Sequence, residues 1–218
     1  MLPSGSVPRH PEDQEILDDA RDFCRQQGIY WKGLIGLTWT DRIEFYRTPP
    51  DHVLIFHDEL ILPKHFMGKL TAEEWRPLVA SALIHRKILK KKFLRGIMRT
   101  LVPALLAMFL GTYVVEHVFS DSSLTSLIAI NVSFFGVGIG LVVLALVRQF
   151  RLLKRYYLEA DEEAGKLLGV DPFLRVLEKM NSIGIPRTQP GRDQPNLQER
   201  IRNLQKVSSG VRPTPPTV

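Results

Sequence analysis

The sequence has almost no cysteine: Cys24 is the single one among 218 residues. One thiol excludes an intramolecular disulfide framework and a cysteine-rich zinc module. Residues 1–15 are polar and lack an apolar run, so we expect no cleavable signal peptide there. Charge is missing locally as well, because Leu124–Val147 contains no charged residue, whereas His85–Thr100 contains seven Lys or Arg and no acid. This segregation is not typical of a soluble protein, although the overall composition is ordinary.

Two uncharged segments predict a transmembrane helical hairpin. As a helix, Leu124–Val147 would be about 36 Å long, which exceeds the ~30 Å hydrocarbon core of a bilayer. The earlier segment, Thr100–Val115, lengthens to a full span if the flanking Arg99 and Glu116 extend their charges to the interfaces. The intervening Phe119–Ser123 is long enough only for a tight turn between antiparallel helices. A buried helix pair in a soluble protein is the alternative interpretation.

Basic residues flank both predicted spans and set their orientation. By the positive-inside rule, both termini lie in the cytoplasm and the turn, whose one charge is Asp121, faces outside. We therefore expect an integral membrane protein with two spans, with the lipid bilayer as partner of these charges and no nucleic acid. The flanking cations are Arg86, Lys87, Lys90, Lys91, Lys92, Arg95 and Arg99 before the first span, and Arg148, Arg151, Lys154 and Arg155 after the second.

The remaining segments predict an α+β, mainly helical domain. Pro11–Gly28 has the apolar period of a helix, with Cys24 on its apolar face. Three short runs predict a sheet of two or three strands: Gly36–Thr40, Arg42–Arg47 and His52–His57. Further helices are expected after the capping box formed by Thr71 and Glu74, and over Arg151–Leu168, Pro172–Met180 and Leu197–Lys206.

These patterns divide the chain into four parts. Residues 1–95 form the first half of a cytoplasmic domain, 96–148 the transmembrane hairpin, 149–207 the second half of the domain, and 208–218 a disordered tail. Within the second span, Gly136 and Gly140 lie four residues apart and are predicted to let the first span pack closely.

Three separated segments resemble motifs of the M48 family of membrane zinc metallopeptidases, the HtpX-like type. Leu70–Ile88 (LTAEEWRPLVASALIHRKI) resembles the helix that carries HExxH in that family. Tyr156–Val170 (YYLEADEEAGKLLGV) resembles the E-x-x-A-D-x-x-A block, and Gln194–Leu204 (QPNLQERIRNL) resembles the terminal H-P-x-x-x-x-R-I-x-x-L. The resemblance covers about residues 50–206. It implies a zincin-like, M48-type cytoplasmic domain with a small sheet, interrupted by the hairpin.

The chemistry of the family is not retained at the matching positions of its HExxH motif. A zincin needs two histidines four residues apart, a third ligand, and a glutamate that activates the zinc-bound water. Here the first histidine position is Ser81 and the glutamate position is Ala82, while the second histidine position keeps His85. Ser81 as a replacement nucleophile activated by His85 is a further hypothesis.

The later motifs have lost their ligands too. The third-ligand position is Tyr157 and the late histidine position is Gln194. Asp161 matches an aspartate that supports a zinc-binding histidine in the family. Here Asp161 could hydrogen-bond His85 and raise its pKa, or pair with lysines. We therefore expect no catalytic residue, no metal and no other cofactor. The remaining histidines are interpreted as surface or strand residues: His10, His52, His57, His65 and His117.

The resemblance implies a membrane-anchored pseudopeptidase that binds or regulates membrane or unfolded polypeptides, or a membrane complex. Val53–Ile61 is the expected sheet edge for an extended peptide. Two alternatives remain open. One is an active metallopeptidase with a non-standard zinc site built from His85, Asp161 and either Glu159 or Glu163. The other is a structural membrane subunit with no ligand groove.

Overall fold

The computed structural model describes residues 11–29, 36–40, 51–56, 59–118, 124–184 and 194–210. The chain divides into two units, each of which is described by itself. We call residues 1–88 together with 154–218 the split domain, because two distant segments of the sequence build it. We call Leu89–Leu153 the helical unit; it contains the whole of the predicted insertion, residues 96–148.

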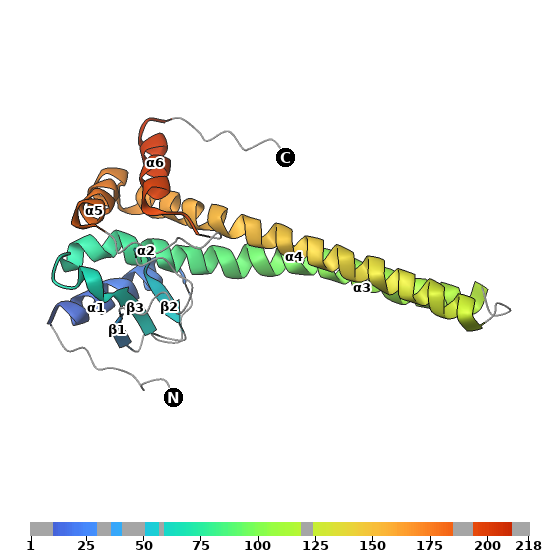
Figure 1. The fold of residues 1–218 in the computed structure, drawn as a ribbon. Coiled ribbons are helices and arrows are strands. Elements are labelled where there is room, and N and C mark those ends of the chain that lie inside the picture. The colour runs from blue at the N-terminus through green and yellow to red at the C-terminus, as the bar shows by residue number, and fades with distance from the viewer. Residues whose placement is uncertain are drawn as a thin grey trace. The chain divides into compact units, whose positions relative to one another are not determined.

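The split domain contains the predicted small sheet. Its strands are β1 (Gly36–Thr40), β2 (Leu54–Phe56) and β3 (Glu59–Pro63), in the order β1-β3-β2 (Figure 1). The central strand β3 pairs parallel with β1 and antiparallel with β2. Leu60 and Leu62 of β3 are fully buried, as a central strand requires.

The sheet differs from its prediction in one respect. The stretch Val53–Ile61 was expected to form one edge strand, but it contains β2 and the beginning of β3, which are antiparallel. Of these two strands, only the short β2 is an edge strand of the described sheet. The separate strand β3 was missed because ELILP follows β2 too closely to be recognised as a new element. The run Arg42–Arg47 lies outside the described residues.

Five α-helices of the described residues belong wholly or partly to the split domain. Four lie inside it: α1 (Pro11–Gln26), α2 (Ala72–Ile88), α5 (Val170–Ile183) and α6 (Leu197–Ser208). The fifth, α4 (Leu124–Leu168), is one continuous helix, whereas the sequence predicted a span and a separate helix. A short 3₁₀ helix, η2, occupies Lys64–Phe66. Helix α6 extends to Ser208, the first residue of the predicted tail, and residues 211–218 lie outside the described part of the chain.

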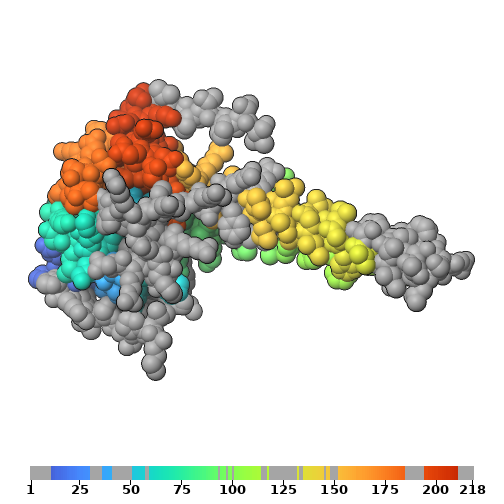
Figure 2. Space-filling model, in the orientation of Figure 1, coloured from blue at the N-terminus to red at the C-terminus, as the bar shows by residue number. Residues whose placement is uncertain are grey.

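The core of the split domain joins these elements. Helix α1 contacts α2 and β1, and α2 in turn contacts β2 and α5. The buried face of α1 includes Cys24, as predicted. Trp39 of β1 meets Trp75 of α2 edge to face, with 5.4 Å between ring centroids. In the space-filling view, the orange and red surfaces of α5 and α6 adjoin (Figure 2).

Capping boxes begin two of these helices. The predicted one before α2 is confirmed: Glu74 N donates to Thr71 Oγ1 at 3.3 Å, and Thr71 N donates to Glu74 Oε2 at 2.8 Å. A second box precedes α6, where Asn196 and Glu199 exchange the same two bonds at 2.8 and 2.9 Å. The pair fixes the entry of α6, which supplies an important side chain to the site below.

The helical unit begins with a π-helix, η3 (Leu89–Phe93), which leads into α3 (Leu94–Val118). The helical stretch Ala72–Tyr113 is long and apolar enough to cross a membrane, and Phe135–Leu144 of α4 is a shorter apolar helix. The turn predicted at Phe119–Ser123 lies outside the described residues. One helix of membrane-spanning character is therefore present in the part of the chain that the structure describes.

Apolar side chains of the helical unit are exposed rather than packed in a core. Only 7% of the most apolar window of the helix is buried, and Phe109 is 72% exposed. A buried helix pair of a soluble protein would show the opposite pattern. The large apolar side chains exposed on α3 are Leu94, Met98, Val102, Leu105, Leu106, Phe109, Leu110 and Tyr113.

Within the helical unit, α3 and the first part of α4 lie side by side (Figures 1 and 2). Gly138 is the glycine at this contact: a Cβ there would lie 2.5 Å from Met108 Sδ. Gly136 and Gly140 have open space around them among the described residues, so the prediction that they form the contact is wrong. The face of α4 that packs against α3 is therefore the one that carries Gly138, not the one that carries Gly136 and Gly140.

Replacing Gly138 with leucine is expected to separate α3 from α4, because the new side chain overlaps Met108. Overpacking of this kind costs about 1–3 kcal/mol. The thermal unfolding midpoint of the full chain in phosphatidylcholine nanodiscs should fall for Gly138→Leu and stay unchanged for the control Gly136→Leu. Equal effects of the two substitutions would contradict the contact.

Candidate functional site

Four of the six site residues expected from the sequence come together between α2 and α4 of the split domain. Ser81 on α2 donates its hydroxyl hydrogen to Asp161 Oδ1 on α4, with 2.6 Å between the oxygens. One turn later on α2, the His85 ring stacks on Tyr157 of α4, with centroids 3.6 Å apart and planes inclined by 15°. Ser81 and Asp161 are both buried.

Arg200 of α6 completes the arrangement and was not selected from the sequence. Its Nε donates to Asp161 Oδ2 at 2.8 Å and its Nη2 donates to Asp161 Oδ1 at 2.9 Å, a bidentate ion pair. The Arg200 side chain is 5% exposed and that of Asp161 is 2% exposed. The signal for Arg200 was present, because it is the arginine of the third M48-like segment.

A buried loop before β2 contributes two more polar residues. His52 Nδ1 lies 3.1 Å from Asp51 Oδ1, and the His52 ring meets Tyr157 edge to face at 5.3 Å. Arg200 Nη1 also reaches the Asp51 carbonyl oxygen, at 3.4 Å. The prediction that His52 is a surface or strand residue is wrong, because it is 3% exposed and precedes the strand.

The electrostatics of the site keep the His85 imidazole and the Tyr157 phenol uncharged at neutral pH. The pKa of His85 is lowered to about 4, chiefly by burial and also by His52 and Arg200, while Asp161 opposes them. Burial likewise raises the pKa of the Tyr157 phenol to about 12. Asp161 does act to raise the pKa of His85, as predicted, but burial outweighs it. Asp161 bonds Ser81 and Arg200 instead of the expected His85. The alternative pairing of Asp161 with lysines is wrong, since its ionic partner is Arg200.

Arg200 and the loop stabilise each other's charges. Although burial opposes the charge, the attraction and hydrogen bonds of Asp161 raise the pKa of Arg200. Burial acts to raise the pKa of Asp51 as well, but His52 and Arg200 lower it overall. Both residues are therefore ionised at neutral pH.

This geometry does not suit Ser81 as a nucleophile. Its hydroxyl hydrogen is directed to Asp161, whose other oxygen is held by Arg200. With a pKa of about 4, His85 is also a weak base at neutral pH. The arrangement orients side chains but supplies no activated hydroxyl.

The donor set does not fit zinc either. Both carboxylate oxygens of Asp161 are engaged by Ser81 and Arg200, and the guanidinium places a fixed positive charge where a cation would be repelled. The described ranges contain no group of three His, Cys, Asp or Glu side chains with metal-binding geometry. The non-standard site of His85, Asp161 and Glu159 or Glu163 is accordingly not assembled in them.

The last two expected positions, Ala82 and Gln194, make no hydrogen bond with the residues described above. Ala82 is half-buried on α2 and carries no polar atom. The Gln194 side-chain oxygen is buried and makes no hydrogen bond within the described part of the chain. Residues 185–193 before it lie outside that part, so its relation to the other positions remains a prediction.

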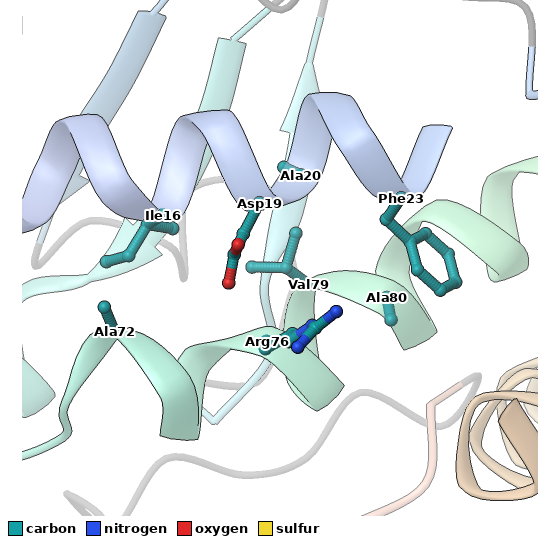
Figure 3. Close-up of a pocket in the computed structure, with 8 residues that line it drawn as sticks. All are labelled: Ile16, Asp19, Ala20, Phe23, Ala72, Arg76, Val79 and Ala80. Carbon is teal, nitrogen blue, oxygen red and sulfur yellow. The ribbon is translucent and has the colours of Figure 1, made fainter. Parts of the chain in front are cut away.

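Among the described residues the site is buried, since Ser81, Asp161, Arg200, Asp51 and His52 have almost no exposed surface. A separate hollow lies between α1 and α2, lined by residues that include Ile16, Ala20 and Val79 (Figure 3). It has room for about one water molecule. None of the site residues lines it.

Comparison of the chain with protein-family models, with curated proteins and with solved structures finds no match. The interpretation of the site accordingly rests on its residues and their geometry.

The substitution Asp161→Leu should destabilise the split domain by about 3–5 kcal/mol, because it leaves the Arg200 charge buried and unpaired. The double variant Asp161→Leu with Arg200→Met should recover much of that loss. Urea unfolding of the reconstituted full chain, followed by tryptophan fluorescence, measures both. The control Lys154→Met removes the exposed pair with Glu199 and should cost less than about 1 kcal/mol. Additive losses in the double variant would contradict the pairing.

Stability should fall as pH drops from about 6.5 toward 4, because the unfolded chain then takes up a proton that folded His85 does not. The variant His85→Phe keeps the stacking on Tyr157 and removes this proton uptake. Its thermal midpoint should decline less than that of the wild type between pH about 7 and about 5. The control His65→Phe should follow the wild-type profile. Identical profiles for His85→Phe and the wild type would refute the neutral buried imidazole.

Proposed function

We propose that this chain is a membrane-anchored, M48-like pseudopeptidase that binds or regulates polypeptides or a membrane complex without hydrolysing them. The observation that carries the proposal is the bonding of Asp161 to both Ser81 and Arg200. Asp161 and Arg200 match residues of the M48 motifs themselves, whereas Ser81 stands where the first histidine ligand would be and gives its hydroxyl hydrogen to Asp161.

The convergence of the three M48-like segments supports the family relationship. Ser81 belongs to the first segment, Asp161 to the second and Arg200 to the third, and their side chains form one hydrogen-bonded cluster. In the family, the aspartate supports a zinc-binding histidine; here Asp161 bonds Ser81, which stands at the first histidine position. The contact is thus retained while the ligand is replaced.

The charges of the site support an inactive centre. A general base and a metal each contribute large factors to peptide hydrolysis, the base alone about 10²–10⁴. At the matching positions, Ala82 cannot accept a proton, and Ser81 replaces a histidine ligand. The burial of the site also favours the second candidate function, a structural membrane subunit with no ligand groove.

Membrane anchoring is supported by the exposed apolar surface of α3 and by the cations at its start. We propose two spans, with α3 as the first and the apolar part of α4 as the second. Both termini would lie in the cytoplasm by the positive-inside rule. For a polypeptide partner, β2 offers an edge strand in the described sheet, where Phe56 is exposed.

The absence of catalysis is tested on the full chain, purified from the membranes of cells grown with added zinc. We expect substoichiometric zinc by elemental analysis and no cleavage of a labelled unfolded polypeptide, whose binding is followed by fluorescence anisotropy. A zinc metallopeptidase serves as the positive control. Binding without cleavage supports the pseudopeptidase, and neither binding nor cleavage supports the structural subunit. Stoichiometric zinc with chelator-sensitive cleavage would overturn both.

The topology is tested in a Cys24→Ser background with single cysteines introduced at Ser122 and Ser209. A membrane-impermeant maleimide should label Ser122→Cys from the outer side and Ser209→Cys only from the cytoplasmic side. The chain should also remain with membranes after alkaline carbonate extraction. Labelling of both positions from one side would contradict the two-span arrangement.

A further inference from the structure

We propose that the cations at the start of α3 form a binding site for the anionic headgroups of membrane lipids. We call Lys90, Lys91, Lys92, Arg95 and Arg99 the basic collar. The inference rests on the membrane anchoring of the proposed function and assigns the lipid class that the anchor selects.

The shape of the basic collar follows from the π-helix. Lys90, Lys91 and Lys92 are consecutive residues of η3, so their side chains spread over about half of the circumference of one helical turn. Arg95 and Arg99 follow four residues apart on one face of α3. By helical periodicity this face falls within the same half, so the cations form one broad basic face rather than a narrow stripe.

Three cations of the collar lack acidic partners within the described ranges. Lys91, Arg95 and Arg99 are exposed, and none of them is paired with a carboxylate there. The sequence has no Asp or Glu between Glu74 and Glu116. Like charges at Arg95 and Arg99 repel each other, so an external anion would stabilise this turn.

Two of the other cations near the spans, Lys87 and Lys154, are already engaged. Lys87 donates to the Gln27 carbonyl oxygen at 3.1 Å, and Lys154 pairs with Glu199 at 2.6 Å. The contrast singles out the start of α3 as the place where positive charge is left for a ligand.

The neighbouring apolar surface selects a lipid rather than a nucleic acid. Leu94, Met98 and Val102 are exposed immediately beside the collar. A broad basic face next to apolar side chains matches the boundary between headgroups and acyl chains, where the phosphates lie. A nucleic acid would meet the same apolar side chains without gaining from them.

The test uses the full chain released from nanodiscs of phosphatidylcholine with a minor share of phosphatidylglycerol, and native mass spectrometry of the retained lipids. Phosphatidylglycerol should be enriched about fivefold over the bulk mixture, the factor that the attraction of one basic residue gives. The triple variant Lys91→Gln, Arg95→Gln and Arg99→Gln should retain lipids at the bulk ratio. The control triple variant Lys69→Gln, Lys166→Gln and Lys206→Gln removes the same charge elsewhere and should keep the enrichment.

The outcomes separate this inference from the proposed function. A bulk lipid ratio for the wild type, or equal loss in both triple variants, overturns the headgroup site while leaving the anchor. Loss of the wild type from vesicles on alkaline extraction overturns the anchor itself. Duplex DNA that binds the nanodisc-embedded chain and is lost only in the collar variant would assign the cations to nucleic acid and overturn the lipid site. Weakening of the enrichment by salt supports the electrostatic origin.

Discussion

The buried ion pair between Asp161 and Arg200 is the constraint on which the split domain depends. A charge removed from water is tolerated only when an opposite charge and hydrogen bonds satisfy it, so each partner requires the other in place. Asp161 lies on α4, and Arg200 lies on α6 behind its own capping box. Ser81 brings α2 to the same carboxylate. Three helices distant in the sequence are thereby held at one point.

The same pair decides what the site can do. A guanidinium remains protonated at every physiological pH, so the positive charge of Arg200 is permanent. Burial, aided by His52 and Arg200, keeps His85 neutral, and burial keeps the stacked Tyr157 protonated as well. Among the described residues, the Asp161 carboxylate is engaged by both Ser81 and Arg200, so this part of the site holds helices together.

The helical unit is governed by a different constraint, the cost of leaving apolar surface in water. Exposed side chains such as Phe109 and Leu106 need a lipid or protein environment. The close contact at Gly138 pairs α3 with α4 without covering those side chains. The insertion between the two segments of the split domain therefore carries the membrane-directed part of the proposed function, while the hydrogen bond from Ser81 to Asp161 joins the two segments of that domain.

The sequence by itself determined the features that depend on neighbours a few positions apart. Four features could be predicted because each depends on residues that are close together in the sequence. They are the capping box at Thr71, the buried face of α1 with Cys24, strand β1, and the segregation of apolar and basic residues. Only the tertiary structure decided the partner of Asp161, the neutral state of His85 and the burial of His52. The physical reason is distance along the chain: Asp161 is 80 positions from Ser81 and 39 from Arg200, and only packing brings their charges together.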